Sequence, residues 1–143
     1  MAFVKVSETE ISFPVVGFSR DDGQLWFGEL WHLMRAGRYD VEKETLIGME
    51  MVDNAMRRWI VRSLDLAEPL KPRRWWQIFG GQSYADFDLT LEELEPLSFA
   101  DVKERIIADC EEIEELEAVE PAARARDLNE LSDALYHQRT GLF

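Results

Sequence analysis

His32 and Cys110 are the side chains of this sequence best suited to act as a base or a nucleophile. His32 follows Glu29 by three residues in the Trp-rich segment 24–36, and a neighbouring carboxylate can orient an imidazole for general-base catalysis. The same pair is common on helix surfaces, so we keep Glu29 and His32 only as residues of an alternative small-molecule pocket. Cys110 is surrounded by acidic residues that disfavour its thiolate, and we interpret it as an inert core thiol. No residue is assigned as catalytic.

Metal and phosphate sites have characteristic spacings that this sequence lacks. His32 and His137 are far apart, and neither has a histidine or cysteine at the spacing of a metal ligand. The glycine pair in "FGGQS" (79–83) is not followed by the Gly-Lys-Ser/Thr of a phosphate-binding loop. We therefore expect no metal and no cofactor, and we consider an enzyme the less favoured interpretation.

The stretch "RRWWQIFGG" (73–81) concentrates arginine and tryptophan in an otherwise acidic chain. These residue types are the most enriched among the energetic hot spots of protein interfaces, so Arg73, Arg74, Trp75 and Trp76 are candidate partner-binding residues. In the alternative interpretation, at least one tryptophan covers the core and the arginines pair with acidic residues near the C-terminus. Stacking on nucleic acid is disfavoured because a net charge of −13 repels phosphates.

Acidic residues are unevenly distributed along the chain. Residues 91–143 hold 15 of the 29 acidic residues but five of the 16 basic ones. Glu111, Glu112, Glu114 and Glu115 follow one another closely in this region, and we predict that they attract a partner with a basic surface. The alternative is a solvated helix face that only keeps the protein soluble. The Glu-x-x-His pairs of di-metal helical bundles are lacking, so a metal is not predicted there.

Apolar alternation and turn residues predict a mainly β region over residues 1–97. Strands are expected at 2–6, at 10–18 and at 84–97, with a hairpin formed by 44–52 and 57–66 around the turn "DNAM". In the second hairpin arm, alternation places Trp59, Val61 and Ser63 on one face of the strand and Leu64 on the other. Pro14 lacks an amide donor, so its strand is expected at a sheet edge or with a bulge. Segment 24–36 has helical spacing, although Gly28 and its bulky residues leave a strand open.

Residues 98–143 have the pattern of two helices. Ser98 and Asp101 match a capping box, and the apolar residues from Phe99 to Leu116, including Ile113, recur at three and four residues over about five turns. Pro121 suits the first turn of a second helix. The sequence therefore predicts a single α+β domain, 1–143, with an antiparallel sheet of about four to six strands packed against a C-terminal helical hairpin.

Composition and fold class together favour a noncatalytic protein-interaction protein. The chain has one cysteine, lacks an apolar leader pattern and has no stretch long enough to span a membrane, so we expect a cytoplasmic protein. In acidity and fold class it is similar to bacterial inhibitors and immunity proteins that mask a basic site. The expected partner is a basic protein or a second copy, and neither nucleic acid nor membrane. The alternative is a small-molecule-binding protein or enzyme with a pocket between sheet and helices near His32.

Overall fold

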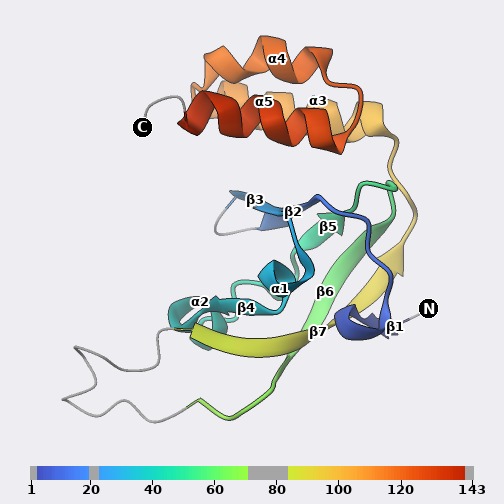
Figure 1. Ribbon diagram of the computed structural model, residues 1–143, viewed down its shortest axis with the longest axis vertical. Helices are drawn as coiled ribbons and strands as arrows, with labels where there is room; N and C mark the ends of the chain where they lie inside the picture. Colours follow the sequence, from blue (N-terminus) through green and yellow to red (C-terminus); the bar gives the residue numbers. More distant parts are fainter. Residues whose placement is uncertain (1–2, 20–22, 71–83, 141–143) are drawn as a thin grey trace, which may run out of the picture.

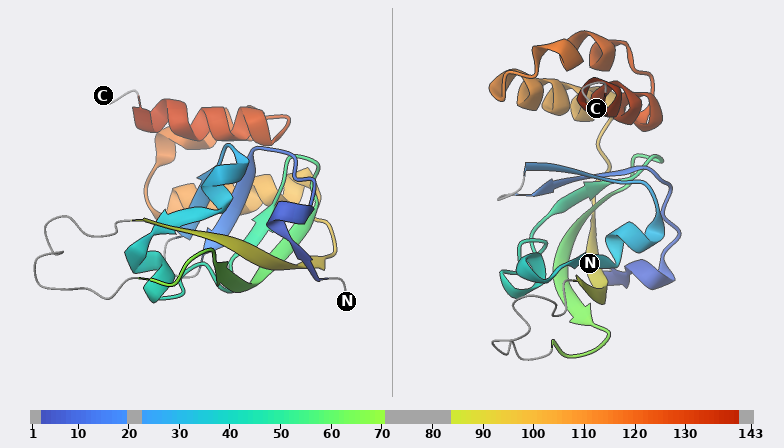
Figure 2. Two further views of the ribbon diagram at one scale, coloured as in Figure 1. Left: turned by 60° about the horizontal axis from the view of Figure 1, so that its bottom comes forward. Right: turned by 60° about the vertical axis from the view of Figure 1, so that its left-hand side comes forward.

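The computed structural model describes residues 3–19, 23–70 and 84–140, with side chains up to Leu135 (Figures 1 and 2). Its strands are β1 Phe3–Lys5, β2 Val15–Ser19, β3 Gly23–Phe27, β4 Arg35–Gly37, β5 Glu50–Val52, β6 Arg58–Leu66 and β7 Tyr84–Leu94. Its α-helices are α1 Leu30–Leu33, α2 Arg38–Glu42, α3 Phe99–Glu112, α4 Val119–Arg124 and α5 Leu128–Thr140. Short 3-10 turns lie at η1 Val6–Glu8 and η3 Leu116–Ala118.

All strand pairs of the sheet are antiparallel, in the order β1-β7-β6-β5-β2-β3, and β4 pairs with the beginning of β7. Helices α3, α4 and α5 form a separate layer over one face of this sheet, while α1 and α2 lie on the other side (Figures 1 and 2). The predicted α+β class, with the sheet in the N-terminal part and the helices at the C-terminal end, is confirmed.

Two apolar cores lie on opposite faces of the sheet, because successive strand residues point to opposite sides. Val15 belongs to the first core, with Met51, Trp59 and Leu33 of α1. Its neighbour along β2, Val16, belongs to the second core. This second core also holds Val52 of β5 and a set of helix residues: Val102, Ile106, Cys110, Ala122, Leu128, Leu131 and Leu135. The helical layer is thus held to the sheet by apolar burial.

The hairpin predicted at 44–52 and 57–66 is formed in part by β5 and β6, because its first arm is a strand only over Glu50–Val52 and residues 44–48 form turns. Asp53 organises the turn between the two strands. The Asp53 side chain is fully buried and accepts hydrogen bonds from the amides of Ala55 and Arg57 and from that of Ser12. The Arg57 guanidinium donates a further bond of 2.9 Å to the same carboxylate. These donors satisfy a buried charge that would otherwise be costly.

A register shift in β6 changes the alternation predicted for this strand. Between Val61 and Ser63 the pairing with β7 slips by one residue, which leaves Arg62 as the extra residue of a bulge. Trp59 and Val61 are buried as expected, but beyond the bulge Leu64, rather than Ser63, packs against the first core. The guanidinium of the extra residue is bound by Glu92 of β7.

Two expectations for the N-terminal half were wrong in part. Segment 24–36 is not one helix: β3 ends at Phe27, α1 is a single turn, and β4 follows. Leu25 and Phe27 of β3 pack on the first core and Trp26 on the second, which is strand alternation. Strand β2 begins at Val15, after Pro14, and lies inside the sheet between β3 and β5. The proline therefore interrupts no ladder bond, and the predicted edge position is wrong.

The helical region is also divided differently from the prediction. Ser98 caps α3 by accepting from the Asp101 amide, as expected, but α3 ends at Glu112. The helix expected from Pro121 onward is two helices, because the chain is extended at Ala125 between α4 and α5. The described part of the C-terminal region thus contains three α-helices rather than a two-helix hairpin.

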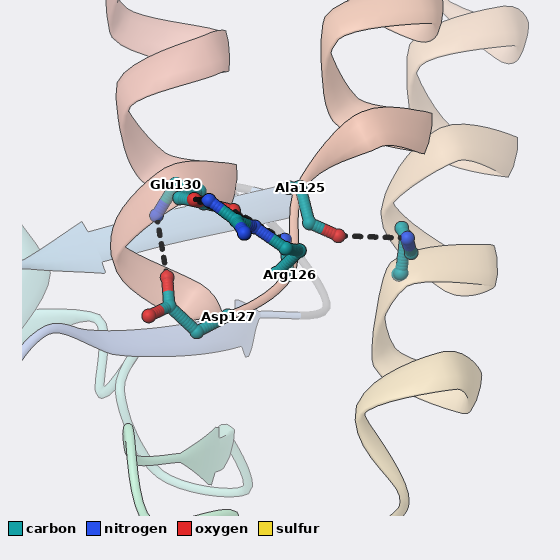
Figure 3. A network of polar contacts seen from close by, with 5 residues as sticks. Ala125, Arg126, Asp127 and Glu130 are labelled. Carbon is teal, nitrogen blue, oxygen red and sulfur yellow. Dashed lines mark hydrogen bonds and ion pairs between the residues drawn. The ribbon is translucent and has the colours of Figure 1, made fainter.

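Polar contacts hold the connection between α4 and α5 in place. Figure 3 shows Glu130 accepting bonds from the amide and guanidinium of Arg126, while the Asp127 carboxylate accepts from the Glu130 amide. Lys103 of α3 donates to the carbonyl oxygen of Ala125 at 2.8 Å and also to that of Ala123. The lysine therefore satisfies the free carbonyls at the end of α4 and joins it to α3.

Candidate binding surfaces

The C-terminal end of α3 carries the glutamates predicted to bind a partner. The helix closes with two backbone bonds, from the Glu115 amide to the Cys110 carbonyl at 2.8 Å and from the Glu114 amide to the Glu111 carbonyl at 3.2 Å. This pair of bonds is the Schellman motif, which requires a left-handed residue just beyond the helix. We refer to residues 111–117 as the acidic turn.

Glu114 occupies the left-handed position of this motif, with φ of 61°. Glycine is the usual residue there, because a Cβ atom in the left-handed region costs about 1–2 kcal/mol. A glutamate at this position is therefore a local departure from the most stable choice. Such departures are concentrated at functional sites, where another requirement selects the residue.

The charges of the acidic turn also oppose the helix dipole. The C-terminal end of a helix carries partial negative charge and favours lysine, arginine or protonated histidine. The last turn of α3 has no basic residue and instead contains Glu111 and Glu112, both exposed. These two side chains therefore add negative charge at the end of the helix that is already partly negative.

Ile113 and Leu116 lie on the surface of the acidic turn, whereas the periodicity of the sequence predicted them in the core. Their exposed fractions are 57% and 63%. The reason is that α3 ends before Ile113, so that neither residue continues the helical phase of Ile106 and Cys110. The turn therefore presents two large apolar side chains among the exposed residues Glu111, Glu112, Glu114 and Glu117, while Glu115 is half-buried.

The other predicted partner-binding residues, Arg73, Arg74, Trp75 and Trp76, lie outside the described residues, as does the side chain of His137. The structure therefore describes one half of the predicted partner-binding set, the four glutamates.

Glu29 and His32, proposed as an alternative pocket, have different partners. The Trp31 indole N–H donates to the Glu29 carboxylate at 2.5 Å. Nδ1 of His32 accepts from the Gly28 amide at 3.2 Å, which leaves the proton of a neutral ring on Nε2. Neither of these two bonds joins the Glu29 carboxylate to the His32 ring, so they do not orient the imidazole as a base. A half-buried His32 does line a small cavity of about 150 Å³, below the roughly 300 Å³ at which ligand pockets begin.

A larger groove lies on the other side of α1, with a volume of about 710 Å³. Its lining comes from α1, β4 and the paired ends of β6 and β7: Leu30, Trp31, Met34, Arg35, Asp65, Ala67, Asp86, Phe87 and Asp88. These residues form no recognisable motif in the sequence. The alternation of β7 and the apolar residues of α1 were visible as patterns, but their meeting depends on the pairing of β4 with β7.

Within the described residues, no group of three or more His, Cys, Asp or Glu side chains is arranged to hold a metal ion, and no helix is both long and apolar enough to cross a membrane. Comparisons with family models, curated proteins and solved structures gave no match.

Proposed function

We propose that this protein is a noncatalytic interaction protein of the cytosol that binds a partner with a basic surface through its acidic turn. The observation that carries this proposal is the exposure of Ile113 and Leu116 among four exposed glutamates. Apolar side chains supply contact area that excludes water, and the surrounding carboxylates supply long-range attraction and select basic partners. An inhibitor or immunity-type protein that masks a basic site fits this surface.

The local energetics of the acidic turn support the same proposal. Glu114 adopts a conformation that favours glycine, and Glu111 and Glu112 lie at the unfavourable end of the helix dipole. A chain selected only for stability would avoid a left-handed glutamate and acidic residues at a helix C-terminus. Positions with such locally unfavourable residues tend to be functional. The cytosolic assignment rests on a single cysteine that is buried in the second core rather than exposed for pairing.

The proposal makes opposite predictions for binding and stability. In the variant Glu111→Lys/Glu112→Lys/Glu114→Lys, we expect affinity for the partner to fall at least tenfold, since charge complementarity is reversed. The melting temperature should rise, because lysines at the end of α3 interact favourably with the dipole. A capture experiment from host lysate at low and moderate salt would identify the partner, and titration calorimetry with the purified partner would measure the affinity.

The matched control is Glu8→Lys/Glu44→Lys/Glu93→Lys, which changes the net charge equally through three exposed glutamates elsewhere. It includes Glu44, whose φ of 54° makes it a second left-handed glutamate. This control should retain the partner. Equal loss of binding in both variants would show that net charge alone attracts the partner and would reject the acidic turn as the site. Failure to capture a salt-sensitive partner with the unaltered protein would reject the function itself.

A further inference from the structure

The groove beside α1 has the size and composition of a binding site for a small molecule. Its lining comes from α1, from β4 and from the adjoining ends of β6 and β7, where β4 pairs with the beginning of β7. Of these elements, α1 lies on the side of the sheet away from α3, α4 and α5 (Figures 1 and 2). Its volume of about 710 Å³ is within the roughly 300–1,000 Å³ of ligand pockets. None of its lining residues belongs to the acidic turn, so it is a second, separate surface.

The apolar part of the groove combines a buried floor with an exposed aromatic rim. Phe87 is 3% exposed and belongs to the first core, whereas Trp31 is 56% and Leu30 is 43% exposed. The Trp31 ring is held in position, because its N–H donates to Glu29 and its edge contacts the His32 ring at a centroid distance of 4.0 Å. A large, oriented and half-exposed indole is a favourable platform for a cation or an aromatic group.

Carboxylates outnumber basic groups among the residues that line the groove. Asp86 is neutralised by Arg35, through bonds of 2.7 Å from Nε and 3.2 Å from Nη2. Asp65 is 4.0 Å from the amine of Lys5, a loose ion pair in which both side chains are about half exposed.

Asp88 differs from the other two aspartates in the donors around it. It accepts hydrogen bonds from the amide and hydroxyl of Ser7 and from the amide of Leu89, all of which are neutral groups. The negative charge of Asp88 is therefore solvated but not cancelled by these bonds.

We propose that the groove binds an organic cation with an apolar body: a primary amine or guanidinium attached to an aromatic group or to an aliphatic group of comparable size. The apolar body lies over Phe87 and Met34, and the cation is placed between the face of Trp31 and the carboxylates of Asp65 and Asp88. Cation–π attraction and charge pairing act on the same group in this arrangement, whereas an anion of the same shape meets a lining in which carboxylates outnumber the guanidinium of Arg35. This inference is independent of the proposed function, because it concerns a different face and a small ligand.

Four probes separate the contribution of charge from that of the apolar body: 4-phenylbutylamine, 4-phenylbutanol, 4-phenylbutyrate and butylamine. Each is titrated into ¹⁵N-labelled full-length protein at neutral pH and 0.15 M salt. We expect 4-phenylbutylamine to shift the amides of Trp31, Met34 and Phe87, with a dissociation constant at least tenfold below that of 4-phenylbutyrate and several-fold below that of the alcohol. Butylamine, which lacks the ring, should leave these amides unshifted at the same concentration.

Two variants locate the site, with a matched control for removal of one carboxylate. Trp31→Ala should weaken 4-phenylbutylamine at least tenfold, and Asp65→Asn should reduce its preference over the alcohol. The control Glu93→Gln, an exposed glutamate outside both the groove and the acidic turn, should leave both values unchanged. If Trp31→Ala alters the fold, the probe series on the unaltered protein still decides the proposal. Equal affinity for amine and carboxylate, or shifts by the amine at the acidic turn instead of the groove, would overturn it.

Discussion

At the scale of single residues, Glu114 shows how a side chain can be unfavourable where it lies and still be informative. It occupies the left-handed closing position of α3, which the backbone bonds of Glu114 and Glu115 require. Asp53 is the opposite case, since a fully buried carboxylate is satisfied by the amide donors around it. One residue departs from the stable choice on the surface, and the other makes a turn possible inside the fold.

The conformation of Glu114 leads to a stability prediction. Glu114→Gly should increase the free energy of unfolding by about 1 kcal/mol, because glycine adopts positive φ without the Cβ penalty. The expected rise in melting temperature is a few degrees for a domain of this size. Thermal denaturation followed by circular dichroism measures it.

The matched substitution is Glu44→Gly, since Glu44 is also exposed and has φ of 54°. It should stabilise the protein by a similar amount. With the partner in hand, Glu114→Gly should weaken binding and Glu44→Gly should not. A loss of stability in both variants would contradict the left-handed assignment of the two residues.

At the scale of the elements, the connection between α4 and α5 depends on charge-assisted hydrogen bonds (Figure 3). The bonds from the Arg126 side chain, and then the one from its amide, lower the pKa of the Glu130 carboxyl below its ordinary value. Hydrogen bonding from Arg35 likewise lowers the pKa of Asp86 where β4 joins β7. Both carboxylates therefore favour the folded state when they are ionised.

These lowered pKa values predict acid sensitivity with a definite sign. A carboxyl group whose pKa is lower in the folded state contributes its stability above the unfolded pKa and loses it as the pH falls through the folded value. The melting temperature should therefore decline as the pH falls below about 4, near the ordinary carboxyl range. The variant Glu130→Gln should decline less steeply over the same pH range.

Thermal melts at intervals of pH, with the carboxyl resonance of Glu130 followed by NMR, test this prediction. The residual decline in Glu130→Gln is expected from Asp86, and the double variant with Asp86→Asn should remove more of it. A Glu130 carboxyl that titrates at or above the ordinary glutamate pKa would contradict the contact with Arg126.

At the scale of the whole molecule, one sheet separates two apolar cores and two candidate binding surfaces. The acidic turn belongs to the helical layer, whereas the groove is lined by α1, which lies on the other side of the sheet, and by residues of β4, β6 and β7 (Figure 2). This separation means that a substitution in one surface need not disturb the other. The net charge of −13 includes carboxylates outside both surfaces, so its overall effect can be tested apart from either one.

From the net charge we predict that added salt has opposite effects on stability and on partner binding. Repulsion among excess carboxylates opposes the compact state, and salt screens it, so the melting temperature should rise by a few degrees between about 0.01 M and 0.15 M salt. Attraction to a basic partner should weaken over the same range. The control variant Glu8→Lys/Glu44→Lys/Glu93→Lys should show a smaller rise. A melting temperature that falls with added salt would indicate that attractive ion pairs outweigh the repulsion.

Several elements could be predicted from local patterns alone, since each depends on neighbours along the chain. The hydroxyl of Ser98 caps α3 as its spacing from Asp101 indicates, and alternation in β7 buries Phe87, Leu89 and Leu91 as expected. The turn at Asp53 was likewise visible, because an aspartate bonds to amides only two and four residues ahead. In each case the deciding interaction lies within a few residues.

Only the tertiary structure decided where each apolar pattern ends along the chain and which residues come together on the surface. Apolar periodicity continues through Ile113 and Leu116, but a left-handed residue ends the helix and moves both to the surface, which spacing alone does not reveal. Segment 24–36 combines strand, turn and strand, because β3 pairs with β2 and β4 with a distant part of β7. The groove beside α1 exists only through that long-range pairing. The sequence by itself therefore determined fold class, charge and local caps, whereas contacts between distant segments decided burial and the sites.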